Sequence, residues 1–158
     1  MLPNNVYGRS QKIDHLVKTL DQSVYAVEPI IQSVYANHVV LAAAGYIEYA
    51  TKEILYEYGR TNGNPKISRY ISQTISWNNA LNCEKIERIL NQFDPCWWPK
   101  IKDATPTKSK ESVDSLKSIR DKIAHGRPNN TGYITVKGYY DDSKRFISDM
   151  CTVILPYG

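Results

Sequence analysis

Arg120 and His125 are the two residues whose types and spacing best match a recognisable chemistry. Cleavage of RNA through its own ribose 2′-hydroxyl needs a group that accepts the hydroxyl proton and a group that protonates the departing 5′-oxygen. Histidine suits both tasks because its ordinary pKa lies near neutrality. The phosphorane gathers negative charge, which a guanidinium stabilises through two parallel hydrogen bonds. The pair therefore supplies the minimum set of groups for this reaction.

The spacing of the two residues restricts how they can act together. A regular helix turns by about 100° per residue, so side chains five positions apart project roughly 140° from each other. Gly126 and Pro128 are expected to end the helix directly after His125, with Gly126 in a left-handed conformation. The pair makes most sense if two copies of the chain pack these helix ends together. Taken alone, the spacing also fits an ordinary solvated helix end.

Metal-dependent chemistry has little support in the sequence. The other two histidines, His15 and His38, lie at positions typical of surface or cap residues, and no group of carboxylates or histidines has metal-ligand spacing. The three cysteines are odd in number and match no zinc motif. We therefore expect no metal site, no cofactor and no disulfide framework, as in a reduced cytoplasmic protein.

Length and composition indicate one globular domain without a membrane anchor. Of the 158 residues, 42% are apolar and 23% charged, so a single domain over 1–158 with its core at about 10–155 is expected. The net charge of +4 permits an anionic partner without requiring one. The longest apolar run, Val39–Tyr46, is too short to cross a bilayer, and the first residues lack a signal-peptide core. We predict a cytoplasmic protein with no membrane partner.

Apolar residues recur at three- and four-residue steps along most of the chain, which predicts an all-α fold. Pro29 is expected to kink or divide the first helical stretch, and Ser10 to cap its start. A proline- and lysine-rich loop with two adjacent tryptophans is expected over 95–110, and a short extended stretch at 132–135 is left open. The expected helices cover residues 10–35, 37–58, 68–76, 82–93, 111–125 and 135–155. The predicted architecture is a bundle of four principal helices plus short ones, without the helix spacing of a DNA-reading helix-turn-helix.

The motif and three longer segments resemble a known family. The stretch R-D-K-I-A-H-G at Arg120–Gly126 resembles the R-x-x-x-x-H signature of HEPN domains, with a polar residue after the arginine. Residues 45–60, 82–98 and 133–150 are similar to helical segments of the RiboL-PSP-HEPN branch, and the second of them includes an F-D-P-x-W turn. The resemblance covers roughly Val39–Ile154, whereas the first 35 residues match less clearly.

The resemblance implies a HEPN-type helical bundle that forms a homodimer and cleaves RNA without a metal ion. The two R-x-x-x-x-H motifs would meet at a shared cleft. By motif position, Arg120 would stabilise the scissile phosphate, His125 would be the acid–base group and Asp121 would orient the pair. Members of the superfamily commonly serve as toxins or as effectors in antiviral defence, so the resemblance allows for a cognate antitoxin or a defence-system partner.

One position departs from a related group of toxins. Toxins partnered by nucleotidyltransferase antitoxins carry a tyrosine two residues after the histidine, which the antitoxin modifies. Here that position is Arg127, and the nearest following tyrosine is Tyr133. Regulation by that route is therefore not expected, whereas a proteinaceous antitoxin of another type stays compatible with the sequence.

Basic residues around the motif are candidates for RNA binding. Lys122 and Arg127 flank the pair and could engage neighbouring phosphates. The segment 107–127 holds six basic and three acidic residues, which agrees with a phosphate-binding groove. For Lys108 and Lys110, a solvated helix face explains the charge equally well.

Two further sets of residues have alternative interpretations. Glu48 could face the cleft and pair with Arg120, or it could pair with Lys52, four residues further on. Three tyrosines could stack on an unpaired base, although core packing explains the last two better. These are Tyr133, Tyr139 and Tyr140.

Three hypotheses about function follow. The first is a metal-independent endoribonuclease that acts on RNA as a toxin or defence effector. The second is a catalytically silent HEPN-like binding or adaptor module that docks an antitoxin, a nucleotide or RNA. The third is a structural helical dimer whose basic surface is incidental. The presence of both Arg120 and His125 favours the first.

Overall fold

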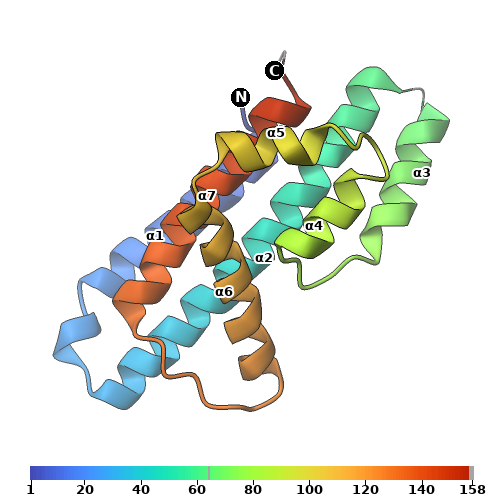
Figure 1. The fold of residues 1–158 in the computed structure, drawn as a ribbon. Helices are drawn as coiled ribbons and strands as arrows, with labels where there is room; N and C mark the ends of the chain where they lie inside the picture. The colour runs from blue at the N-terminus through green and yellow to red at the C-terminus, as the bar shows by residue number, and fades with distance from the viewer. Residues whose placement is uncertain (64, 157–158) are drawn as a thin grey trace.

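The computed structural model describes residues 1–63 and 65–156, and every regular element within them is a helix (Figure 1). The elements in chain order are α1 (Asn4–Asp21), the short 3-10 helix η1 (Val24–Ala26), α2 (Pro29–Asn62), α3 (Pro65–Ser76), α4 (Cys83–Leu90), α5 (Trp97–Ala104), α6 (Thr107–Ala124) and α7 (Tyr133–Ile154). The four long helices are α1, α2, α6 and α7. The prediction of an all-α bundle with four principal helices and several short ones is confirmed.

The first predicted helix, over 10–35, is wrong in its bounds. α1 begins directly after Pro3, and a separate helix begins at Pro29. Pro29 occupies the first turn of α2, where its missing N–H is not needed and its fixed φ suits a helix. It therefore divides the stretch, which was one of its two predicted effects, and does not kink a continuous helix. Ser10 does not cap α1 either. It is buried within the helix, and its hydroxyl donates to the carbonyl oxygen of Tyr7.

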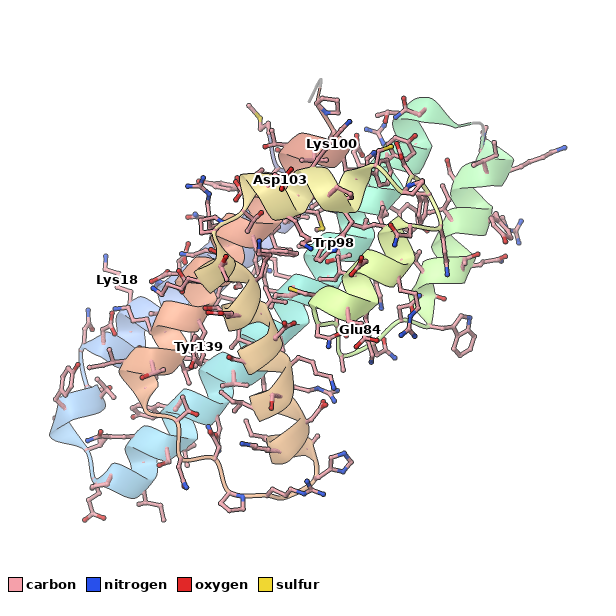
Figure 2. All side chains as sticks on the ribbon, in the orientation of Figure 1. Lys18, Glu84, Trp98, Lys100, Asp103 and Tyr139 are labelled. Atoms are coloured by element: carbon pink, nitrogen blue, oxygen red, sulfur yellow. The ribbon has the colours of Figure 1, made fainter. Side chains whose placement is uncertain are left out.

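The predicted loop over 95–110 is mostly helical, because it contains α5 and the start of α6. Trp97 and Trp98 begin α5 and are buried. Figure 2 shows Trp98 on the side of α5 that faces the bundle, while the exposed Lys100 and Asp103 lie on its outer side. The tryptophans thus anchor α5 to the core. The extended stretch considered at 132–135 does not form, because it provides the N-cap and first turn of α7.

α2 is the central helix of the bundle and packs against α1, α3, α6 and α7 (Figure 1). Among the helices in the described part of the chain, it alone has the length and apolar composition to cross a membrane. The apolar part of α2 is longer than the uninterrupted run Val39–Tyr46 on which the sequence prediction was based. A core helix of a globular bundle passes the same test, and α2 contributes Val40, Tyr46 and Ile54 to the buried core.

α1 and α7 are joined by two repeats of the same three residue types. In the first repeat, the Tyr140 hydroxyl lies 3.0 Å from the Ser10 carbonyl oxygen and 3.0 Å from an Asp14 carboxylate oxygen. Lys144 pairs with the same Asp14 carboxylate at 2.8 Å. The second repeat consists of Asp21, Tyr133 and Lys137. It lies seven residues later in α1 and seven residues earlier in α7 than the first. We call these six side chains the α1–α7 seam.

Candidate active site

A closed turn at the end of α6 fixes the position of His125. Gly126 has a φ of +65°, which confirms its predicted left-handed conformation. Its N–H donates to the Ile123 carbonyl at 3.1 Å, and the Arg127 N–H donates to the Lys122 carbonyl at 2.8 Å. This pair of hydrogen bonds is the Schellman motif, which satisfies the last carbonyl groups of a helix. His125 is the C-cap residue, so a rigid backbone presents its exposed side chain to solvent.

His125 lines a shallow groove of about 350 Å³ at this end of α6. The other lining residues come from α6, from the turn after it and from the start of α4. They are Asn82, Asp114, Lys117, Ser118, Asp121, Lys122 and Arg127. We call this the His125 groove. Three residues proposed from the sequence as supporting or RNA-binding (Asp121, Lys122 and Arg127) thus share a groove with His125. Lys117, one of the six basic residues counted in 107–127, lines it as well.

Both acidic residues of the groove already have partners. An Asp121 carboxylate oxygen lies 2.5 Å from Lys117 Nζ, and the other lies 3.4 Å from a guanidinium nitrogen of Arg120. The hydrogen bond from Lys117, followed by the influence of Arg120, lowers the pKa of Asp121 below its ordinary value. The Asp114 carboxylate accepts a hydrogen bond of 2.8 Å from the Cys83 N–H and so ties α6 to α4. These carboxylates therefore stabilise the groove and do not neutralise its remaining cations.

The remaining cations of the groove are Lys122 and Arg127, both exposed. Within residues 1–63 and 65–156, neither side chain has a carboxylate partner. Lys108 and Lys110 behave differently, because Lys108 pairs with Asp142 at 3.2 Å and Lys110 donates to carbonyl oxygens around the α5–α6 turn. These two lysines therefore have partners within the chain and do not line the groove. The surplus positive charge is thus concentrated at the end of α6 that carries His125.

Arg120 does not line the His125 groove. Its side chain is 38% exposed and its guanidinium lies beside Asp121. This agrees with the roughly 140° between side chains five positions apart on a helix. Both groups are accessible to solvent, but one copy of the chain does not direct them to the same point.

Comparison with known families covers this site and nearly all of the described chain. A family model described as RiboL-PSP-HEPN matches residues 4–155. The chain belongs to the RiboL-PSP-HEPN family. The match includes α1, whereas the resemblance noted in the sequence began only at about Val39. It supports a HEPN domain of the kind found in ribonucleases and nucleotide-binding modules. Searches of curated proteins and of solved structures gave no match.

Glu48 of this HEPN chain takes the second of its two predicted roles. One of its carboxylate oxygens pairs with Lys52 at 3.0 Å, and the other accepts a hydrogen bond of 3.0 Å from the Ala80 N–H. Glu48 therefore does not pair with Arg120. Two of the candidate stacking tyrosines, Tyr133 and Tyr140, are buried in the α1–α7 seam and cannot meet a base.

The first half of α2 exposes a strip of apolar side chains near the motif. These are Ile30, Ile31, Val34 and Leu41. Asn37 in the same part of α2 accepts a hydrogen bond of 3.0 Å from Asn129 in the α6–α7 loop. This hydrogen bond ties the first half of α2 to the loop that follows the HEPN motif helix. The periodicity of the sequence did not separate the exposed residues of the strip from core residues.

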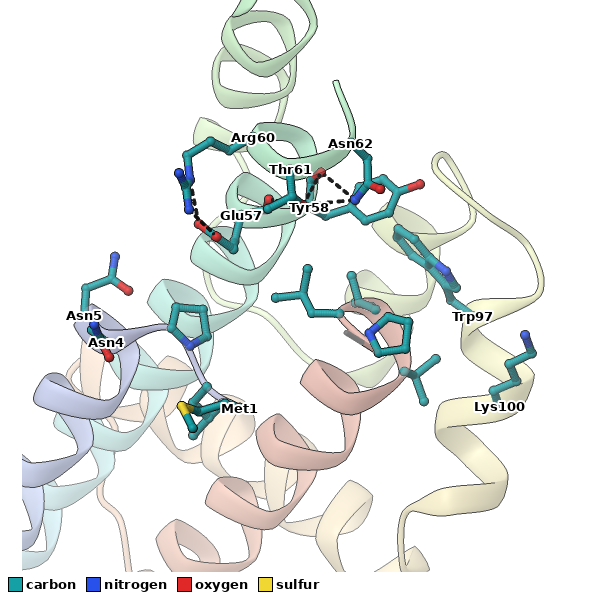
Figure 3. A pocket seen from close by; sticks show the side chains of 16 residues that line it. Met1, Asn4, Asn5, Glu57, Tyr58, Arg60, Thr61, Asn62, Trp97 and Lys100 are labelled. Carbon is teal, nitrogen blue, oxygen red and sulfur yellow. Dashed lines mark hydrogen bonds and ion pairs between the residues drawn. The ribbon is translucent and has the colours of Figure 1, made fainter. Parts of the chain in front are cut away.

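A cavity larger than the His125 groove lies elsewhere in the HEPN bundle (Figure 3). It has a volume of about 860 Å³ and is lined by the start of α1, the end of α2, the start of α5 and the end of α7. Figure 1 places this end of the bundle, where both termini lie, opposite the α6–α7 loop. The charged side chains among the described residues that line it are Lys100 and the paired Glu57 and Arg60, and none of these residues is a histidine. The residues that the motif singled out therefore lie outside this cavity, and His125 lines the smaller groove.

Proposed function

We propose that the chain is a metal-independent endoribonuclease. The observation that carries this proposal is the His125 groove, where an exposed imidazole on a hydrogen-bonded helix end lies beside Lys122 and Arg127, which have no carboxylate partner among the described residues. RNA brings negative phosphates to such a surface, and cations without partners bind them strongly. Lys122 and Arg127 would hold the phosphates on either side of the scissile bond. The family belongs to the HEPN superfamily, which generally includes ribonucleases, and this supports the same proposal.

The reaction follows from the groups present. The ribose 2′-oxygen gives its proton to an imidazole and forms a bond to the adjacent phosphorus. The resulting phosphorane carries extra negative charge, which the guanidinium of Arg120 stabilises. The bond from phosphorus to the 5′-oxygen then breaks, and that oxygen takes a proton from an imidazole. The products are a 2′,3′-cyclic phosphate and a free 5′-hydroxyl.

We further propose that the working unit is a homodimer. In one copy, Arg120 lies outside the groove that His125 lines. A two-fold axis beside α6 would bring the Arg120 of one copy to the His125 of the other, because such an interface uses the same patch of both chains. The α2 strip supplies the apolar contact, since Ile30 is 69% exposed and Val34 is 56% exposed on a single helix face.

In the cell, this activity fits a cytoplasmic toxin or an antiviral defence effector, held in check by an antitoxin or released by a defence-system partner. Expression of the chain alone should then arrest growth, and His125→Ala should relieve the arrest. Equal toxicity of both forms would favour the alternative, a catalytically silent HEPN module that docks an antitoxin, a nucleotide or RNA.

The direct experiment is cleavage of single-stranded RNA by the purified protein in EDTA. We expect products with a 2′,3′-cyclic phosphate, and no cleavage when a single 2′-deoxynucleotide stands at the cut site. His125→Ala should lower the rate by a factor on the order of 10² to 10⁴, the usual contribution of acid–base catalysis. Arg120→Ala should have a comparable effect.

Matched controls separate catalysis from general loss of charge. His15 is an exposed histidine of α1, and Arg145 is an exposed arginine of α7 that pairs with Asp149. His15→Ala and Arg145→Ala should cleave at the rate of the unmodified protein. Cleavage that persists at the 2′-deoxynucleotide, or equal rates for His125→Ala and His15→Ala, would overturn the proposal.

A further inference from the structure

The loop between α3 and α4 presents Trp77 to solvent. This side chain is 86% exposed, whereas Trp97 and Trp98 are each 6% exposed. Tryptophan has the largest apolar surface of any residue, and folding normally removes most of it from water. A fully exposed tryptophan on a loop is therefore a candidate contact residue, and neither the motif nor the His125 groove uses it.

The backbone of this loop adopts a strained conformation at Ala80. Ala80 has a φ of +51°, and it is the one non-glycine residue with positive φ in the described part of the chain. Residues with a Cβ adopt this left-handed conformation at an energetic cost. Such strain persists only where surrounding contacts enforce it, and it concentrates at functional sites.

The enforcing contacts come from the two neighbouring helices. From α2, Glu48 accepts a hydrogen bond from the Ala80 N–H at 3.0 Å, and Lys52 donates to the Ser76 carbonyl at 3.2 Å. Lys52 also donates to the Asn79 side chain at 3.3 Å. From α4, Lys85 donates to the carbonyl oxygens of Asn79 and Ala80 at 3.1 and 3.2 Å. The loop is thus held on both sides of Trp77, at Ser76 and at Asn79–Ala80.

The surroundings of Trp77 suit a nucleotide. Trp77 lines a depression of about 230 Å³. The other lining residues are three amides, two cations and an isoleucine, with no acid: Asn78, Asn79, Lys85, Arg88, Ile89 and Gln92. An aromatic face stacks on a base, amide groups read base edges and a guanidinium binds phosphate. Arg88 pairs with Glu84 at 3.0 Å, but both side chains are largely exposed, and such surface pairs yield readily.

The depression is continuous in sequence with the His125 groove. Asn79 lines the depression and Asn82, three residues later, lines the groove. The segment that carries Trp77 therefore borders both the depression and the groove. The apolar α2 strip, by contrast, has the composition of a protein contact. The mixture of amides and cations around Trp77 favours RNA.

We propose that Trp77 is a base-stacking platform that binds one unpaired nucleobase of the RNA strand lying in the His125 groove, with Arg88 on an adjacent phosphate. This rests on the proposed function for the identity of the substrate. Glu48 and Lys52 act as positioning residues, because they shape the loop and do not touch the base. One tryptophan then adds affinity at a point separate from the bond that is cut.

The test measures binding apart from cleavage. The probe is a short, mixed-sequence single-stranded RNA with 2′-O-methyl groups throughout, which cannot form the cyclic product. Trp77→Ala should weaken its binding about tenfold, equivalent to about 1.4 kcal/mol, as expected for one stacked base. Trp77→Phe should retain most of the affinity. Tyr7→Ala, a matched loss of an exposed aromatic on α1, should change nothing.

Two further measurements define the role. On a strand with abasic sites in place of all bases, Trp77→Ala should have no effect, because only stacking is lost. Glu48→Ala should weaken binding in the native background but not in the Trp77→Ala background, a non-additivity that general destabilisation would not produce.

The outcomes separate this inference from the proposed function. Equal affinity of Trp77→Ala and the unmodified protein would overturn the stacking role, while cleavage that depends on His125 would leave the nuclease intact. If no form of the protein cleaves RNA but binding still depends on Trp77, the nuclease proposal is wrong and the stacking role of Trp77 stands. A lower molecular mass of Trp77→Ala in light scattering would place Trp77 in a protein interface and contradict the proposal.

Discussion

The α1–α7 seam and the His125 groove use similar polar residues in opposite ways. In the seam, each aspartate has both a tyrosine hydroxyl and a lysine as partners. In the groove, Lys122, Arg127 and His125 face solvent, and the aspartates present are already engaged with other groups. The seam therefore completes its own interactions, whereas the groove has charge left over for another molecule.

This difference separates stability from binding. Removing a buried hydroxyl lowers the free energy of unfolding, because its hydrogen-bond partners are then left unpaired away from water. Exposed cations contribute little to folding and are free to bind phosphates. Substitutions in the seam should therefore change stability more than activity, and substitutions in the groove should do the reverse.

The largest stability effect is expected at the centre of the seam. Tyr140→Phe removes a hydroxyl that bonds the Ser10 carbonyl and Asp14, so the free energy of unfolding should fall by roughly 1–2 kcal/mol. The control is Tyr46, whose ring lies edge-to-face with that of Tyr140, with 6.2 Å between the ring centroids. The buried Tyr46 hydroxyl has no hydrogen-bond partner within the described residues. Tyr46→Phe should be neutral or stabilising in urea unfolding. Equal losses for both variants would mean that the seam's hydrogen bonds do not matter.

A smaller effect is expected at the turn that presents His125. Gly126→Ala places a Cβ on a residue with φ of +65° and should cost about 1 kcal/mol of stability while lowering the cleavage rate. Gly138 lies within α7 with open space around it, so Gly138→Ala should stabilise by about 0.5–1 kcal/mol and leave cleavage unchanged. Thermal unfolding and a cleavage assay check both. Unchanged cleavage in Gly126→Ala would show that the turn does not position the imidazole.

The smallest effect is acid sensitivity of the seam. The hydrogen bond from Lys137 holds the pKa of Asp21 below its ordinary value, and the Tyr133 hydroxyl acts in the same direction. Asp21 therefore contributes stability above the unfolded pKa of about 3.9, and this contribution is lost as the pH falls through the lower folded value. The stability difference between the native chain and Asp21→Asn should shrink below about pH 4. A difference independent of pH would contradict this origin.

Much of the fold could be predicted from the sequence, because helical periodicity is a local signal. The bundle, the helix end at His125 and the left-handed Gly126 followed from residue types within a few positions. The helix bounds were less accurate, because Pro29 breaks or begins a helix depending on where the preceding turn lies. The proline- and lysine-rich segment over 95–110 hid α5, because two tryptophans buried against the core stabilise that helix.

The candidate site was predictable only in part. The motif indicated His125, Asp121, Lys122 and Arg127, which share one groove. Lys117 counted in the basic excess of 107–127, but its pairing with Asp121, four residues further on, was not predicted. The Trp77 loop could not be predicted, because its shape depends on hydrogen bonds that Glu48 accepts from it and Lys52 donates to it, about thirty residues earlier in the chain. Periodicity does not carry such long-range contacts.

The central claim is that Arg120 of one copy and His125 of the other act on the same phosphodiester. It is tested most directly by mixing Arg120→Ala and His125→Ala proteins, each inactive alone, under conditions that allow subunit exchange. Half of the dimers formed at random are mixed, and each mixed dimer has one intact site of two, so about a quarter of the native cleavage rate should return. A mixture as inactive as its two components, with mixed dimers demonstrated by mass, would contradict the shared cleft.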